Sequence, residues 1–180
     1  MSNILEQTTA VPTGTWAVDP THSSVGFAVK HMAVGSFKGG FDEFEARLED
    51  GVLSGTAKVA SVNVKDEQLN AHLQSPDFFD AERYPEIRIA TTGPLEVENG
   101  RVSADAELTL RGVTQPATLT GTITGPATDP YGNERLGIDL ETEIDRTAFG
   151  VSWNAELPNG GPVAGNEVKL TAELELVKEA

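Results

Sequence analysis

The sequence predicts an all-β fold in which a curved antiparallel sheet closes into a barrel. In segment after segment, large apolar residues alternate with small or polar ones, as in strands that are buried on one face. Two-residue turn sequences, Asp50-Gly51 and Asn99-Gly100, separate such segments and are typical of hairpins. The segments amount to roughly eight to ten strands, and an open sheet of that size usually curls or closes.

The segment 14–44 contains the first strands and indicates how the sheet is built. Val25, Phe27 and Val29 alternate with small or polar residues, which is typical of a half-buried strand. The small residues on the other face indicate that another part of the chain packs closely there, or that the strand bends. The glycine-rich stretch 35–41 tolerates a bulge or strong curvature. We therefore expect a sheet whose concave face carries the large apolar side chains.

Later segments continue this pattern with one irregularity and one helix. Phe41 and Phe44 are three residues apart, so the apolar phase slips by one and predicts a bulge near Asp42 and Glu43. The segment 66–73, DEQLNAHL, begins with acidic residues and has two leucines on one side, which predicts a short helix. Two adjacent phenylalanines follow it in a polar loop. We expect this piece to cap one end of the barrel.

The remaining strands are expected from the same alternation. A strand is predicted over residues 54–64, and the clearest amphipathic strand covers residues 102–111. Others are predicted over residues 117–124, 136–144 and 168–176. An interior enclosed by about eight strands is just wide enough to be filled by side chains or to hold one small ligand. The pattern alone leaves both possibilities open.

Composition and charge exclude some classes of function. The chain has 180 residues with a hydrophobic fraction of 38%, enough for one domain with a proper core. Its formal charge of -15 repels a phosphate backbone, so we expect no nucleic-acid partner. Cysteine is absent, which excludes disulfides, thiolate nucleophiles and cysteine metal sites, and leaves the redox compartment undetermined.

The chain is expected to consist of a flexible N-terminal arm, residues 1–13, and a barrel domain, residues 14–180. The arm is polar and contains Pro12. It has neither a basic start nor an apolar run of signal-peptide length, and about 18 consecutive apolar residues occur nowhere. We therefore expect a cytoplasmic protein without a transmembrane segment.

Residues that could support catalysis or bind a metal have simpler structural interpretations. Asp19, His22 and Ser23 are the ingredients of an acyl-transfer triad, but residues so close in a turn rarely make both required contacts. A turn in which Asp19 and Ser23 bond backbone amides is favoured. His22, His31 and His72 have no metal-ligand spacing, so no metal site is expected. Arg111 and Arg146 are expected to pair acids and pin strand ends rather than to contact a ligand.

Several separated motifs in a fixed order resemble the YceI-like family. They are WAVDPTHSSVGFAVKHMAVGSFKGGF, LNAHLQSPDFFDAERYPEIRI, LTLRGVTQPATL and YGNERLGIDLETEIDRTAFGV, which together extend from about Trp16 to Leu176. The resemblance implies an extended, eight-stranded, antiparallel lipocalin-like barrel with an apolar tunnel. It also implies a polyisoprenoid or another long-chain amphiphile as ligand, and a homodimer. Many members carry a secretion signal, whereas this sequence starts without one.

The leading hypothesis is non-catalytic binding, transport or sequestration of a polyisoprenoid or fatty-acid-like lipid, with no cofactor. The residues expected to line the tunnel and its entrance are Val25, Phe27, Val29, His31, Met32, Phe41, Phe44, Leu69, Phe78, Ile87, Ile89, Leu108, Leu110, Leu119, Ile138 and Leu140. One alternative is a small hydrolase or isomerase that uses His22 or His31 as base on a lipid. Another is an interaction module with a packed interior.

Overall fold

The computed structural model describes Thr8 and residues 10–180, and strands dominate them. The elements in chain order are β1 (Thr15–Val18), η1 (Pro20–His22), β2 (Ser24–His31), β3 (Gly35–Phe41), β4 (Phe44–Glu49), β5 (Val52–Lys58), η2 (Val59–Ser61), β6 (Val62–Asn63), α1 (Glu67–Gln74), β7 (Glu86–Thr91), β8 (Glu96–Glu98), β9 (Arg101–Leu110), β10 (Val113–Thr128), β11 (Glu134–Asp145), η3 (Arg146–Phe149) and β12 (Ala164–Lys178). The predicted all-β class with one short helix is confirmed.

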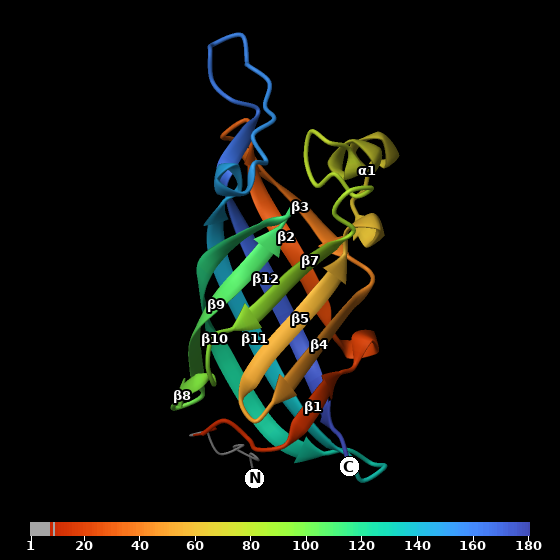
Figure 1. The fold of residues 1–180 in the computed structure, drawn as a ribbon, viewed down its shortest axis with the longest axis vertical. Helices are drawn as coiled ribbons and strands as arrows, with labels where there is room; N and C mark the ends of the chain where they lie inside the picture. Colours follow the sequence, from red (N-terminus) through yellow and green to blue (C-terminus); the bar gives the residue numbers. More distant parts are fainter. Residues whose placement is uncertain (1–7, 9) are drawn as a thin grey trace.

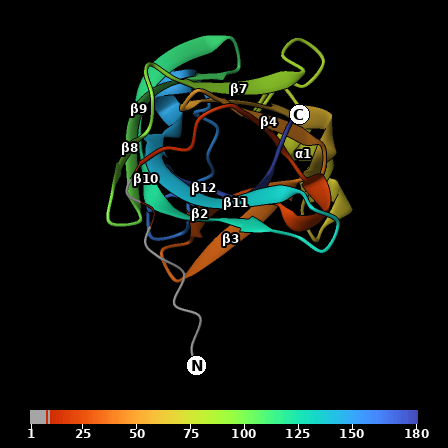
Figure 2. The same ribbon diagram turned by 90° about the horizontal axis from the view of Figure 1, so that it is seen from below.

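The strand segments form one antiparallel sheet that closes as an eight-stranded barrel (Figure 1). Four of the eight strands are interrupted, so that β1 with β2, β3 with β4, β5 with β6, and β7 with β8 each act as one strand. Each strand pairs with its neighbours in sequence. Closure comes from β12, which pairs with β2 along one part of its length and with β1 along the rest. Figure 2 shows the strands surrounding the barrel axis.

The local irregularities follow the sequence signals closely. The predicted bulge is a break of two residues, Asp42 and Glu43, between β3 and β4. Asp50-Gly51 and Asn99-Gly100 have positive φ at both positions, as tight hairpin turns require, so these turns are confirmed. The strand expected over residues 54–64 is interrupted, because η2 separates β5 from β6.

The helix predicted over residues 66–73 is confirmed as α1, and it lies at one end of the barrel (Figure 1). The Asp66 carboxylate caps its first turn by accepting a hydrogen bond of 2.9 Å from the Leu69 amide. Leu73 is buried, and Leu69 packs against the same apolar cluster. The hydrophobic side of this short helix therefore faces the barrel interior.

The opposite end of the barrel carries β1 and the C-terminus and is densely packed (Figure 1). Trp16, Leu48 and Leu176 are almost fully buried there, and the Trp16 indole donates to the Thr13 carbonyl. The Thr8 hydroxyl donates to the Gly125 carbonyl at 2.7 Å. Part of the predicted arm thus lies against the barrel. Residues 1–7 and 9 lie outside the described residues, so the flexibility of the arm stays a prediction.

A cluster of charges spans the interruption between β1 and β2. Arg135 donates from Nη1 to the Asp19 carboxylate at 2.8 Å and from Nε to the Asp129 carboxylate at 2.8 Å. The His22 Nδ1 lies 2.8 Å from the same Asp19 oxygen and 3.3 Å from Glu175 of β12. Hydrogen bonds from His22 and then Arg135 lower the pKa of Asp19 to about 2. The cluster ties the broken strand to β11 and β12.

Replacing Asp19 by asparagine should lower the stability of the barrel at pH 7, and the difference should vanish in acid. The folded-state pKa of Asp19 lies near 2, below the ordinary value of 3.8. The ionised carboxylate therefore stabilises the fold above the ordinary value and loses this effect as the pH falls towards 2. Urea midpoints of both proteins between pH 7 and 2 measure the difference. Asp139→Asn, a change at an exposed position of β11, is the control. Equal urea midpoints of wild type and Asp19→Asn at pH 7 would contradict the stabilising role of the ionised Asp19 carboxylate.

Candidate functional site

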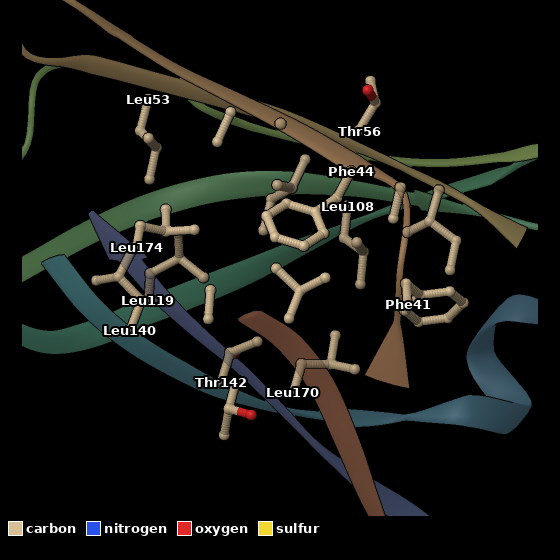
Figure 3. Close-up of a pocket in the computed structure, with 18 of the residues that line it drawn as sticks. Phe41, Phe44, Leu53, Thr56, Leu108, Leu119, Leu140, Thr142, Leu170 and Leu174 are labelled. Carbon is tan, nitrogen blue, oxygen red and sulfur yellow. The ribbon is translucent and has the colours of Figure 1, made fainter. Parts of the chain in front are cut away.

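Two adjoining apolar cavities occupy the barrel interior. The cavity nearer α1, called here the upper cavity, has a volume of about 470 Å³. The inner cavity lies deeper in the barrel and has a volume of about 150 Å³ (Figure 3). Four residues line both cavities: Phe41, Ile87, Leu108 and Leu170. The two cavities therefore adjoin across these side chains.

Aromatic rings form much of the wall of the upper cavity. The ring of Phe27 lies 5.8 Å from that of Phe41 and 6.2 Å from that of Phe79, centroid to centroid. Gly39 lies opposite Phe27 in the sheet, and a Cβ at Gly39 would stand only 2.6 Å from the Phe27 ring. The small residue on β3 therefore lets the Phe27 ring lie flat along the wall. The close packing predicted on the small-residue face of β2 is a separate contact, since a Cβ at Gly26 would stand 2.9 Å from the Gly39 carbonyl oxygen.

The upper cavity reaches the surface at the end that carries α1. Its lining includes exposed residues at the ends of β2 and β3, among them Lys30, His31 and Ser36. On the other side of this opening lie His72 of α1 and Trp153 of the segment between η3 and β12. The rings of these two residues are 4.7 Å apart in an edge-to-face arrangement. We call this region the mouth.

Most residues predicted to bind the ligand face one of the two cavities. Those on the inner cavity are Val25, Phe41, Phe44, Ile87, Ile89, Leu108, Leu119 and Leu140. Those on the upper cavity are Phe27, Val29, His31, Leu69, Phe78 and Leu110, in addition to the shared residues. Strand alternation had predicted the strand positions among them, whereas His31, Leu69 and Phe78 had been assigned to the entrance. Contact of all these residues with a ligand stays a prediction.

Two of the predicted residues line neither cavity. Ile138 is 0% exposed and belongs to the packed cluster at the closed end, so its inward direction brings it to other side chains and not to open space. Met32 lies in the turn between β2 and β3 with a φ of 53° and is 42% exposed. It stands beyond the end of β2, where the alternation of that strand no longer applies.

Several lining residues were missed by the sequence analysis. Phe79 was predicted only as part of the cap and not as a separate lining residue. Trp153, Val151 and Val163 carry no periodic signal because they lie outside regular strands. Ile144 lies at the end of β11, in the same alternation as Leu140, and this signal could have identified it. The segment between η3 and β12 contributes to the mouth only through the tertiary fold.

The two arginines do not make the predicted pairs with acids. Arg111 donates from Nη1 to the carbonyls of Phe78 and Gly150, at 3.0 and 3.1 Å. Arg146 is 4% exposed and donates to three backbone carbonyls. Each arginine still ties loops to strand ends, but carbonyl oxygens of irregular backbone take the place of carboxylates. Arg146 is also part of the lining of the upper cavity, which was not expected.

The candidate triad residues form a structural turn. The Asp19 carboxylate accepts from the Thr21 amide and the Ser23 hydroxyl accepts from the Glu175 amide, as predicted. The His22 side chain is 61% exposed and lines neither cavity. Ligand atoms of Asp19, His22 and Glu175 do lie within 4.8 Å of one another. The Arg135 guanidinium already contacts both carboxylates, which opposes a metal cation at this place.

The fold and the cavity define an up-and-down β-barrel with an elongated apolar interior that opens at one end. A sequence model of the YceI-like domain matches residues 16–176. The chain belongs to the YceI-like family, as the motifs predicted.

Relatives agree with this assignment over most of the chain. A UPF0312 protein of Staphylococcus aureus strain USA300 is 33% identical over 165 residues, which covers 87% of this chain and 94% of the relative. The crystal structure of BcnA from Burkholderia cenocepacia has a TM-score of 0.75 at 23% identity, covering 88% of this chain and 98% of that one. A polyisoprenoid binding domain from Saccharophagus degradans has a TM-score of 0.70 at 14% identity, covering 91% and 98%.

In the described part of the chain, no helix has both the length and the apolar character that crossing a membrane requires.

Truncating Ile138 should destabilise the barrel more than truncating Ile87. Ile138 is packed on all sides, so Ile138→Ala leaves a new void and should cost about 3–5 kcal/mol. Ile87 already faces open space in both cavities, so Ile87→Ala should cost roughly 2 kcal/mol or less. Urea unfolding of the ligand-free protein measures both values. Equal losses would mean that the interior near Ile87 is as tightly packed as the closed end.

Proposed function

We propose that this protein binds a long-chain amphiphile, a polyisoprenoid or a fatty-acid-like lipid, and carries or sequesters it without chemical change. The observation that carries the proposal is the pair of adjoining apolar cavities inside the barrel. A monomeric barrel of this size could have been filled by its own side chains. Open apolar space inside a closed barrel is instead suited to a hydrocarbon chain.

The expected energetics are sufficient for useful affinity. Burying about ten methylene groups stabilises a complex by roughly 8 kcal/mol, before the costs of association are subtracted. No covalent step or metal is needed. The structurally similar domain from Saccharophagus degradans is a polyisoprenoid binding domain. We extend this ligand class to the present chain as part of the proposal.

The catalytic alternative has less support. A hydrolase or isomerase needs a base beside the bound lipid, and His22 lies outside the lining of both cavities. His31 lies on the lining but is exposed at the mouth, and no acid within the described residues forms an ion pair with it. Homodimer formation and a cytoplasmic location also stay predictions.

Mass spectrometry of an organic extract of the purified protein tests the proposed function. We expect a stoichiometric lipid, or, after delipidation, saturable binding of polyprenyl and fatty-chain probes. Loss of bound lipid after Phe27→Asp, in a variant that keeps its β-sheet circular dichroism, would support the site. Absence of both a native lipid and probe binding would refute the function.

Filling the inner cavity should shorten the longest chain that binds well. Ala172 lines this cavity, and Ala172→Phe should exclude the end of a long chain. Excluding about two methylene groups costs roughly 1.6 kcal/mol, which is slightly more than tenfold in affinity. Titration with fatty acids of increasing length measures the effect, and short chains should bind unchanged. The control is Ala90→Phe, on the exposed face of β7. An equal loss of affinity for fatty acids of all lengths would contradict the assignment of the inner cavity to the end of the hydrocarbon chain.

A further inference from the structure

The titratable side chains that line the upper cavity are all basic. They are Lys30, His31, His72 and Arg146, and each can carry a positive charge. Within residues 8 and 10–180, no Asp or Glu belongs to this lining. The whole chain has 28 acidic residues against 13 Lys and Arg and 3 His. A lining of average composition would hold more carboxylates than cations, so the mouth has the opposite charge character to the rest of the protein.

Arg146 is the most buried of these four groups. Its Nε donates to the Gly165 carbonyl at 2.8 Å, and its Nη1 donates to the carbonyls of Val151 and Trp153 at 2.9 Å each. Its Nη2 is buried and has no hydrogen-bond partner among the described residues. The adjacent Asp145 carboxylate accepts hydrogen bonds from Thr147, and no ion pair with Arg146 forms in the described part of the chain.

A buried guanidinium without a counter-ion is costly, because three neutral carbonyls replace only part of its hydration. Burial lowers the pKa of Arg146, but a guanidinium starts so far above neutrality that it stays charged. An unpartnered donor on a charged, desolvated group is a strong site for an anionic acceptor. The three carbonyls hold this donor in a fixed orientation before any ligand arrives.

The neighbours of Arg146 complete a polar end of the cavity. Trp153, whose carbonyl accepts from Arg146, packs edge to face against His72. The His72 ring also packs on Phe78 at 4.9 Å, and its Nε2 lies 3.0 Å from the Asp77 carboxylate outside the lining. His72 is therefore held at the mouth by contacts on several sides.

The inner cavity has a different character. Its two carboxylates, Glu45 and Glu141, occupy exposed, outward-facing positions of β4 and β11. The inward-facing side chains around it are apolar except Thr142 (Figure 3). The upper cavity thus has cationic groups in its lining, and the inner cavity is lined by apolar side chains. This arrangement suits an amphiphile whose head group lies nearest the mouth.

We propose that the amphiphile carries an acidic head group, a carboxylate or a phosphate, which binds at Arg146 in the mouth while its hydrocarbon chain fills the inner cavity. This inference rests on the proposed function and specifies its ligand. A neutral acceptor would meet the free Nη2 donor of Arg146 without adding a charge, and Asp145 interacts with the guanidinium only electrostatically, with no hydrogen bond to it among the described residues. An acidic head group supplies both an acceptor and a counter-charge, and it is also attracted by Lys30 and His31.

Pairs of ligands that share a chain and differ in the head group test this inference. The pairs are oleic acid with oleyl alcohol, and geranylgeranyl phosphate with geranylgeraniol, titrated into the full-length delipidated protein at pH 7. We expect the acidic member of at least one pair to bind about tenfold or more tightly, as a charge-assisted hydrogen bond provides. The pair with the larger preference distinguishes carboxylate from phosphate. Equal binding of acid and alcohol would overturn the inference and leave lipid binding intact. Binding of neither would refute the proposed function itself.

Variants assign the preference to particular residues. Arg146→Gln should abolish the preference for the acid, measured as the ratio of acid to alcohol affinity in the same variant, whereas Arg146→Lys, which keeps the charge, should retain part of that ratio. A preference that survives in Arg146→Gln would overturn the assignment to Arg146. Because Arg146 also ties three backbone segments, circular dichroism must first establish that the variant folds.

His31→Glu decides the question if Arg146→Gln does not fold. His31 is exposed on the same lining, so a carboxylate there should weaken acid binding about tenfold more than it weakens alcohol binding. Lys38→Glu, on an exposed position of β3 that lines neither cavity, is the control for charge alone. Unchanged acid binding in His31→Glu, or an equal loss in Lys38→Glu, would overturn the inference.

Discussion

The interior of this protein depends on the backbone hydrogen bonds that β12 makes on both of its sides. On one side it pairs with β11 from Arg135 opposite Val177 to Asp145 opposite Glu167. On the other side it pairs with β2 and then with β1. Closure removes the free edges of the sheet and separates the inner face from water. An open sheet would expose the same apolar side chains to solvent, and they would collapse on one another.

Closure is possible because three neighbouring strands are interrupted at adjacent places. The first break is η1, the second is the pair Asp42 and Glu43, and the third is η2. The last two are joined directly, since the Asp42 and Glu43 amides both donate to Ser61. The charge cluster around Arg135 holds the first. The strands can therefore change direction along this side of the barrel.

The two ends of the barrel differ in packing and in polarity. At the closed end large side chains such as Trp16, Leu48 and Ile138 fill the interior. Toward α1 the inward positions are lined by rings that lie along the wall, and open volume remains between them. The titratable groups that line the upper cavity are basic, although the chain as a whole is strongly acidic. Because the basic groups lie toward one end of the apolar interior, a bound amphiphile is expected to have one orientation, with its head group toward the mouth.

The sequence by itself determined the class of fold, the hairpin turns, the bulge, the capping helix and the direction of most inward side chains, because alternation and turn chemistry are local properties. The tertiary structure alone decided which inward residues meet open space. Ile138 and Leu140 share one alternation, yet only Leu140 lines a cavity, since the packing of the opposite strands differs at the two depths. It also decided the partners of Arg146, because Gly165 and Trp153 approach its guanidinium only when the segment after η3 folds over the mouth.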